Sequence, residues 1–169
     1  MNKTTKYILG ILFICLMSCI HSFGQSVYSV PIKEDIGPNA WRTMKNAIKQ
    51  AKQNKSEYLL IDLNTYGGAL NFADSIRSSL LNDNGFKTIV YVNNNAASAG
   101  ALISLAADYI YMHSGASLGA ASVVNQNGEI LPEKYQSYMR GLMRATAEAK
   151  GRDAKVAKPL SIPQYQSLH

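Results

Sequence analysis

Cysteine and histidine are scarce in this sequence, which contains two cysteines and three histidines among 169 residues. Both cysteines, Cys15 and Cys19, lie near the N-terminus, so the rest of the chain has no disulfide, thiol nucleophile or cysteine-based metal site. There is also no His-x-x-His pair, no carboxylate cluster and no glycine motif of the nucleotide-binding kinds. The sequence therefore gives no support to metal, thiol or nucleotide chemistry, and we expect no cofactor.

Residues 1–24 have the pattern of an export signal. Two lysines near the start are followed by an almost unbroken apolar run over residues 7–20 and by small residues at Ser22 and Gly24. The apolar run is short for a membrane span, so we predict a cleaved signal peptide and an exported protein, periplasmic or on the outer face of the cell membrane. An uncleaved anchor and a lipoprotein signal cut before Cys19 are the alternatives.

Charge is mild in the 145 residues that follow, where 15 basic and 11 acidic side chains give a formal charge of +4. Lys45, Lys49 and Lys52 share one face of a predicted helix, which is typical of a solvated surface. Aromatic residues do not alternate with basic ones as they do in many nucleic-acid interfaces. We expect no nucleic-acid partner.

Strands and helices alternate along the chain, with short connections. The apolar pattern predicts strands over residues 27–32, 58–63, 88–92 and 109–112, a strand-prone segment over 115–124, and helices over about 41–54, 70–81, 97–107 and 132–151. Asn39 is the predicted cap of the first helix, and Asn93–Asn95 a predicted loop. Continuous apolar strands are typical of a buried parallel sheet. The fold class is therefore α/β, with a mostly parallel sheet and flanking helices.

Two loops follow buried strands, and sites in open parallel sheets form at the carboxyl ends of strands. In the first loop, Gly67 and Gly68 leave backbone amides accessible, and such amides can stabilise an oxyanion. A tight turn between strand and helix explains the same glycines. In the second loop, Ser98 begins a helix whose free amides favour a developing negative charge. A serine that merely caps this helix is the alternative.

A serine nucleophile needs a general base. Beyond the signal, the only histidines are His113, at a predicted strand end, and His169, the last residue. This shortage favours a lysine, which can act as a base when burial or nearby cations lower its pKa. Lys134, near a predicted helix start, is the candidate, and an ordinary surface lysine is the alternative.

Ser117 lies in a literal G-x-S-x-G match over residues 115–119. A nucleophile elbow joins a long strand to a helix and is followed by an acid and a histidine. The segment after Ser117 is not a clear helix and only His169 follows, so Ser117 is a weak candidate.

Five ordered segments, taken together, resemble the protease domain of NfeD-type membrane-bound serine proteases, which have the ClpP/SppA/crotonase fold: residues 27–32, 60–68, 90–103, 106–112 and 115–121. The resemblance implies a ClpP-like serine protease domain over residues 25–153. It implies a Ser–Lys dyad of Ser98 and Lys134, with the amides of Gly68 and Ala99, beside Gly67, as the oxyanion hole. Family members are associated with apolar segments of membrane-associated proteins, including stomatin-like substrates, and with homodimers.

The chain departs from the family pattern in two places. Thr65-Tyr66-Gly67 stands where family members more commonly have Thr-Pro-Gly. Residues 154–169 form an unfamiliar, aperiodic tail, whereas family members usually continue into further protease residues. We therefore expect a truncated product, attached to the membrane through a missing C-terminal region or an uncleaved signal. A non-catalytic peptide-binding remnant of the same fold is one alternative. A crotonase-like acyl-CoA enzyme is another, which export disfavours because coenzyme A is cytoplasmic.

Overall fold

The computed structural model describes residues 25–119, 122–125 and 127–153, and the predicted signal and tail lie outside these ranges. Its elements are β1 (Val27–Ile32), α2 (Pro38–Gln53), β2 (Tyr58–Thr65), α3 (Leu70–Leu81), β3 (Lys87–Ala97), α4 (Ala99–Ala106), β4 (Tyr109–Met112), β5 (Ser117–Gly119) and α5 (Glu133–Ala149). The predicted α/β class is confirmed, and the alternation of strands and helices follows the order that the sequence indicates.

The strands form a parallel sheet in the order β1-β2-β3-β4, and β5 also pairs with β3. Strand β2 occupies one edge of the long strand β3, with a register shift between Leu63 and Thr65. Along the other edge, β4 pairs with Ile89–Val92 and β5 pairs with Asn95–Ala97. The carboxyl ends of β1, β2, β3 and β5 therefore lie side by side.

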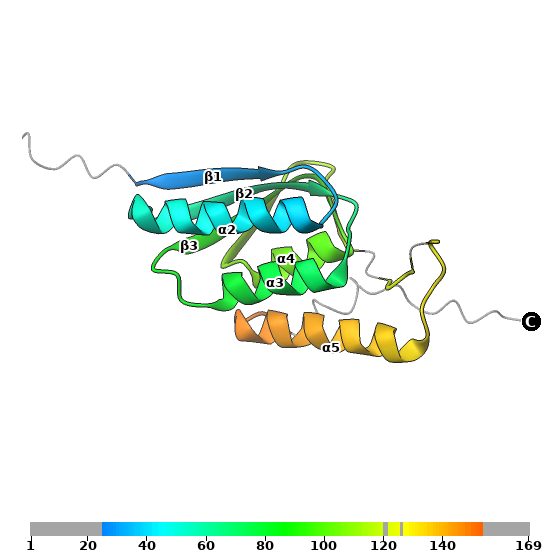
Figure 1. Cartoon of the computed structure of the whole chain (residues 1–169). Coiled ribbons are helices and arrows are strands. Elements are labelled where there is room, and N and C mark those ends of the chain that lie inside the picture. The colour runs from blue at the N-terminus through cyan, green and yellow to red at the C-terminus, as the bar shows by residue number, and fades with distance from the viewer. Residues whose placement is uncertain (1–24, 120–121, 126, 154–169) are drawn as a thin grey trace, which may run out of the picture.

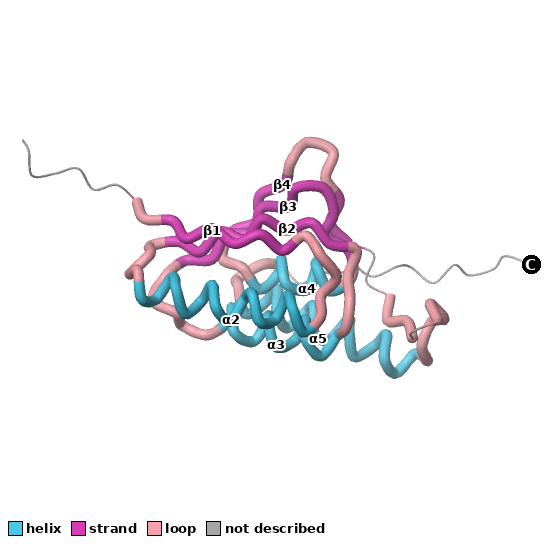
Figure 2. Tube along the Cα trace, turned by 45° about the horizontal axis from the view of Figure 1, so that its top comes forward, coloured by secondary structure: helices cyan, strands magenta, loops and turns pink. Residues whose placement is uncertain are grey.

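Helices α2, α3 and α4 all lie on one side of this sheet (Figures 1 and 2), where α2 and α4 contact the strands and α3 packs against both of these helices. The strand residues that face them, such as Ile61 and Val90, are fully buried. Helix α2 is amphipathic: Met44 is buried, whereas the lysines at 45, 49 and 52 are exposed, as predicted. Helix α5 packs against α4. Within the described ranges, no helix is both long and apolar enough to cross a bilayer.

Two local predictions are wrong. Helix α2 begins at Pro38 after Gly37, so Asn39 lies inside the helix and accepts a hydrogen bond from Arg42 at 3.1 Å. Proline fits a first turn because its φ is already helical and it needs no amide acceptor there. The predicted loop at Asn93–Asn95 is strand instead, because these residues continue β3 as far as Ala97.

The C-terminal end of α5 is fixed to the end of α4. Lys150 donates a hydrogen bond to Asp108 at 3.0 Å. Arg152 donates to the carbonyl oxygens of Leu105 and Ala107 at 2.9 and 2.8 Å, which are among the carbonyls that a helix end leaves without a partner. The two helices are therefore joined at this end by charged groups and by backbone hydrogen bonds.

Candidate active site

Ser98 stands between the end of β3 and the first residue of α4. Its backbone has φ 51° and ψ −110°, in a region that residues with side chains rarely adopt. Its amide donates to the carbonyl of Gly119 at 2.9 Å, which fixes the turn. The hydroxyl does not cap α4, and no hydrogen bond joins it to a described residue. The capping interpretation of Ser98 is therefore wrong: the serine is held in a strained turn and its hydroxyl is available.

Two glycines bring the loop after β2 against this turn. Gly67 and Gly68 have φ values of 128° and 144°. A Cβ on Gly67 would lie 3.0 Å from the Cβ of Ser98, and a Cβ on Gly68 would lie 2.4 Å from the carbonyl oxygen of Ile36. Ile36 donates to Gly67 at 2.7 Å and accepts from Ala69 at 2.8 Å. The loop is thus held between Ile36 and Ser98, with no room for a side chain at Gly68 and only tight space for one at Gly67.

The amides of Gly68 and Ala99 remain without a hydrogen-bond acceptor among the described residues. Gly67 differs, because its amide donates to the hydroxyl of Thr65 at 3.1 Å. Ala99 is the first residue of α4, where helical amides have no partner within the helix. Two free N–H groups beside an available serine hydroxyl are what an oxyanion hole requires.

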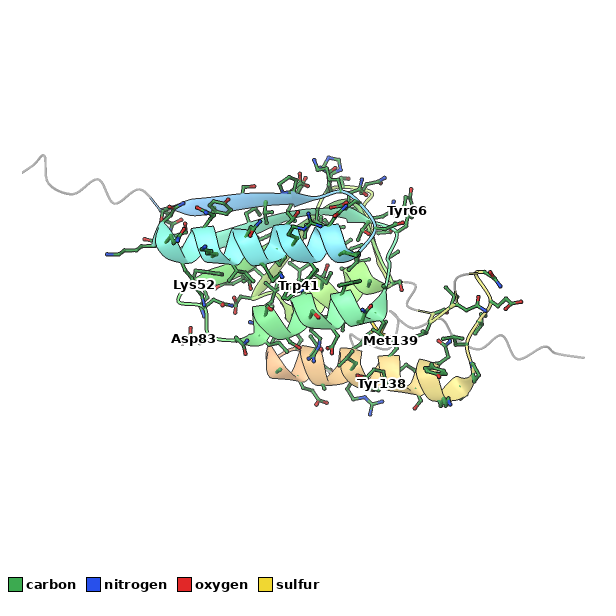
Figure 3. The ribbon with its side chains drawn as sticks, in the orientation of Figure 1. Trp41, Lys52, Tyr66, Asp83, Tyr138 and Met139 are labelled. Atoms are coloured by element: carbon green, nitrogen blue, oxygen red, sulfur yellow. The ribbon has the colours of Figure 1, made fainter. Side chains whose placement is uncertain are left out.

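Ser98 lines a cleft of about 970 Å³ at the carboxyl ends of the strands. Much of the lining is apolar, including Leu70, Val123 and Met139, and Tyr66 is exposed over it. Figure 3 shows Tyr66, from the loop after β2, and Met139, from α5, at the same end of the molecule. The site therefore combines a serine, free amides and an apolar groove.

Lys134 lies in the first turn of α5 and is exposed. Its ammonium nitrogen is 5.0 Å from the centroid of the Tyr135 ring. It is not among the residues that line the cleft, and no hydrogen bond joins it to Ser98. The structure thus brings together Ser98, Gly68 and Ala99 and leaves Lys134 outside their immediate contacts.

Gln136 supports this site, although no pattern in the sequence selects it. Its amide oxygen accepts a hydrogen bond from the backbone amide of Val123 at 3.0 Å. Its amide nitrogen donates to the carbonyls of Val123 and Leu131 at 2.7 and 3.1 Å. Gln136 therefore ties one wall of the cleft to α5, two residues after Lys134.

The two other candidates from the sequence lie elsewhere. Ser117 begins β5 and donates to the side chain of Asn95 at 2.6 Å, so its hydroxyl is engaged in the sheet. His113 is exposed in the turn after β4, and its ring Nδ1 lies 2.8 Å from the carbonyl oxygen of Ser114. Neither residue lines the cleft. His169 lies outside the described residues.

The sequence profile of the NfeD1b N-terminal domain matches residues 26–166. The chain belongs to this family. Membrane protein NfeD1b of Bacillus subtilis is 31% identical over 143 residues, which are 85% of this chain and 32% of that protein. Membrane-bound protease PH1510 of Pyrococcus horikoshii is 31% identical over 159 residues, covering 84% of this chain and 35% of that protein. The chain spans about a third of these two relatives, both of which are named as membrane proteins.

Solved structures agree with this assignment. A serine-to-alanine mutant of the 1510-N membrane-bound stomatin-specific protease superposes on this chain with a TM-score of 0.75 at 28% identity. The match covers 81% of this chain and 70% of the protease chain. A lysine-to-alanine mutant of it, in complex with a substrate peptide, has the same TM-score and identity, covering 82% and 67%. ClpP1 of Listeria monocytogenes, at 19% identity and a TM-score of 0.61 over 79% and 78%, shows the fold alone. The ClpP-like fold and the NfeD resemblance predicted from the sequence are confirmed.

Proposed function

We propose that this domain is a serine endopeptidase in which Ser98 is the nucleophile. The observation that carries the proposal is the strained turn at Ser98, whose hydroxyl is available beside the free amides of Gly68 and Ala99. Similarity to the stomatin-specific protease 1510-N supports it.

In this mechanism, Ser98 Oγ attacks the carbonyl carbon of the scissile peptide bond. The carbonyl oxygen becomes negatively charged and accepts hydrogen bonds from the amides of Gly68 and Ala99. The amino end of α4 favours the same charge. The tetrahedral intermediate then expels the leaving amine, which takes up a proton, and water hydrolyses the acyl-enzyme to release the carboxylate and restore the serine.

Lys134 is the proposed general base, which takes the proton of Ser98 and passes it to the leaving amine. No described histidine lines the cleft, and Lys134 lies on α5, the helix that Gln136 ties to the cleft wall. Catalytic contacts are often long without substrate and tighten once it binds. In the proposed mechanism, Lys134 turns away from Tyr135 and reaches Ser98 when a peptide fills the cleft.

Apolar segments of membrane-associated proteins, stomatin-like proteins among them, are the proposed substrates. The apolar lining of the cleft supports this substrate class, as does the stomatin specificity in the name of 1510-N. Export by residues 1–24 would place the domain in the periplasm or on the outer face of the cell membrane, where it would act as a homodimer.

Cleavage of quenched fluorescent apolar peptides by the purified full chain tests the proposal. Ser98→Ala and Lys134→Ala should each abolish cleavage while retaining the circular dichroism spectrum of the fold. Ser117→Ala and Lys45→Ala are matched controls away from the cleft and should remain active. A fluorophosphonate probe should label Ser98 and no other serine. Cleavage that survives Ser98→Ala would refute the nucleophile, and cleavage that survives Lys134→Ala would refute the base.

The position of Lys134 supports a second candidate function, a domain that binds apolar peptides without cleaving them. An exposed lysine outside the cleft is what such a domain would show. Peptide binding that is equal in the wild type and Ser98→Ala, with no cleavage and no probe labelling, would favour this function over the protease.

A further inference from the structure

The cleft crosses the ends of neighbouring strands in a fixed order. Strands β1, β2 and β3 are adjacent. Asp35 lies in the segment after β1, Gly68 in the loop after β2 and Ser98 at the end of β3, and all three line the cleft. The bridge between Ile36 and Gly68 holds the first two segments together, and the second comes close to the third where Thr65 pairs with Ala96 and Gly67 approaches Ser98. Asp35 is therefore at the β1 end of the cleft, on the far side of Gly68 from Ser98.

Asp35 is the only charged residue among the described residues that line the cleft. It has no hydrogen bond or ion pair with any described residue. The nearest basic residue in the sequence, Lys33, is paired at 2.7 Å with Asp62. A free carboxylate beside an apolar surface attracts an opposite charge and repels a like one more strongly than it would in open water.

We propose that Asp35 selects peptides with a lysine or arginine on one side of the scissile bond. This inference rests on the proposed function, in which the cleft holds the substrate beside Ser98. Two strand spacings separate the β1 and β3 segments, a distance of about 10 Å, and an extended peptide advances about 3.3 Å per residue. The basic residue therefore lies about three residues from the scissile bond, towards β1, with apolar residues filling the rest of the cleft. Arginine can form two parallel hydrogen bonds with the carboxylate.

Peptide binding to the full chain carrying Ser98→Ala tests this inference without depending on catalysis. The probes are fluorescein-labelled, uncharged apolar decapeptides in which one lysine replaces each residue in turn. Norleucine is the neutral match for lysine at each position, and glutamate is the opposite charge. The dissociation constant is measured by fluorescence anisotropy on Ser98→Ala alone and with Asp35→Asn, Asp35→Lys or Glu34→Gln added. Glu34 is the matched control, because it is the adjacent exposed carboxylate and does not line the cleft.

Lysine should bind about three- to tenfold more tightly than norleucine at one position or two adjacent positions, and at no others. The ratio should fall towards one with Asp35→Asn, reverse in favour of glutamate with Asp35→Lys, and persist with Glu34→Gln. Added salt should reduce the ratio, because the pair is partly exposed.

Three outcomes would overturn the inference. One is equal binding of lysine and norleucine peptides at every position, and another is a lysine preference that survives Asp35→Asn. Both leave the protease proposal intact if Ser98-dependent cleavage is observed. The third is that no peptide binds, and the cleavage assay with Ser98→Ala then decides separately whether the proposed function also fails.

Discussion

The two ends of α4 are built in opposite ways. At the C-terminal end, Arg152 donates to the carbonyls of Leu105 and Ala107, and Lys150 pairs with Asp108. At the N-terminal end, the Ala99 amide has no acceptor among the described residues, and Ser98 is held in a strained conformation. One end has its polar groups paired and the other keeps them available. The difference separates the part of the helix that stabilises the fold from the part that can act on a ligand.

Gly68→Ala should have the largest effect on stability and activity, because it disrupts the loop that lies beside the N-terminal end of α4. The new Cβ would lie 2.4 Å from the Ile36 carbonyl oxygen, on a residue with φ 144°. We expect a loss of about 3 kcal/mol of unfolding free energy, since both overpacking and a disfavoured backbone contribute. Cleavage should be lost, because the amide is displaced. Urea denaturation and the peptide assay measure the two effects.

Gly85→Ala is the matched control, because Gly85 also has a positive φ, 76°, but no heavy atom lies within 4 Å of its added Cβ. It should lose only about 1 kcal/mol and remain active. Equal losses in the two variants would mean that backbone conformation, rather than the contact with Ile36, makes Gly68 necessary.

Arg152→Ala should have the next largest effect on stability, because it removes the hydrogen-bond donor from the C-terminal end of α4. Three carbonyls lose a donor: those of Leu105 and Ala107, and that of Asp108 at 3.1 Å. The expected loss of unfolding free energy is about 2 kcal/mol, since these groups are partly buried. Arg140→Ala, which removes an exposed ion pair with Glu133, should lose under about 0.5 kcal/mol. A loss as small for Arg152→Ala would contradict the pairing described here.

Parts of the fold around α4 could be predicted from the sequence. The sequence predicts helix α3 at its observed bounds, Leu70–Leu81, because its apolar spacing and the turn residues after it are local signals. The extension of β3 through Asn93–Asn95 could not be predicted, because asparagine disfavours strands. There the Asn64 side chain accepts a hydrogen bond from the Asn95 amide at 3.1 Å, and β5 pairs with the same segment.

The site divides in the same way. Ser98 and Gly68 could be predicted because each follows a buried strand, where sites of parallel sheets form. Asp35 lines the cleft, and Gln136 bonds Val123 of its wall, only through tertiary packing, and no local pattern marks either residue. The sequence places Lys134 near the start of a helix, and it lies in the first turn of α5, outside the residues that line the cleft.

Asp108→Asn should destabilise the C-terminal end of α4, by an amount that depends on pH. Burial alone would raise the pKa of Asp108, but hydrogen bonds from the Thr88 amide and hydroxyl and from Lys150, with the positive charge of Lys150, bring it below its ordinary value of 3.8. A lowered pKa means that the unfolded chain takes up a proton first as the pH falls. Stability from the ionised group is therefore complete above about pH 4 and is lost as the pH falls through the folded-state pKa.

We expect the wild type to exceed Asp108→Asn by about 1.5 kcal/mol of unfolding free energy at pH 7. The difference should shrink as the pH falls below about 4 and through the lowered folded-state pKa, where the carboxyl group of the folded protein becomes protonated. Lys150→Gln keeps the hydrogen bonds from Thr88 to Asp108. At pH 7 it should therefore lose less unfolding free energy, relative to the wild type, than Asp108→Asn does. Urea denaturation at several pH values measures the loss of unfolding free energy in both variants. A loss for Asp108→Asn that grows as the pH falls would contradict the predicted direction of the pH dependence.

Ser98→Gly should have the smallest effect on stability, and with the opposite sign. Glycine adopts φ 51° and ψ −110° without the steric penalty that serine pays there, whereas Ser98→Ala keeps that penalty. Both variants lose the nucleophile, so both should be inactive. Ser98→Gly should nevertheless be about 1 kcal/mol more stable than Ser98→Ala, as measured by thermal or urea unfolding. Equal stabilities would mean that the turn stores no strain. The predicted gain would show that the available end of α4 is held in a conformation that the fold supports at the expense of its own stability.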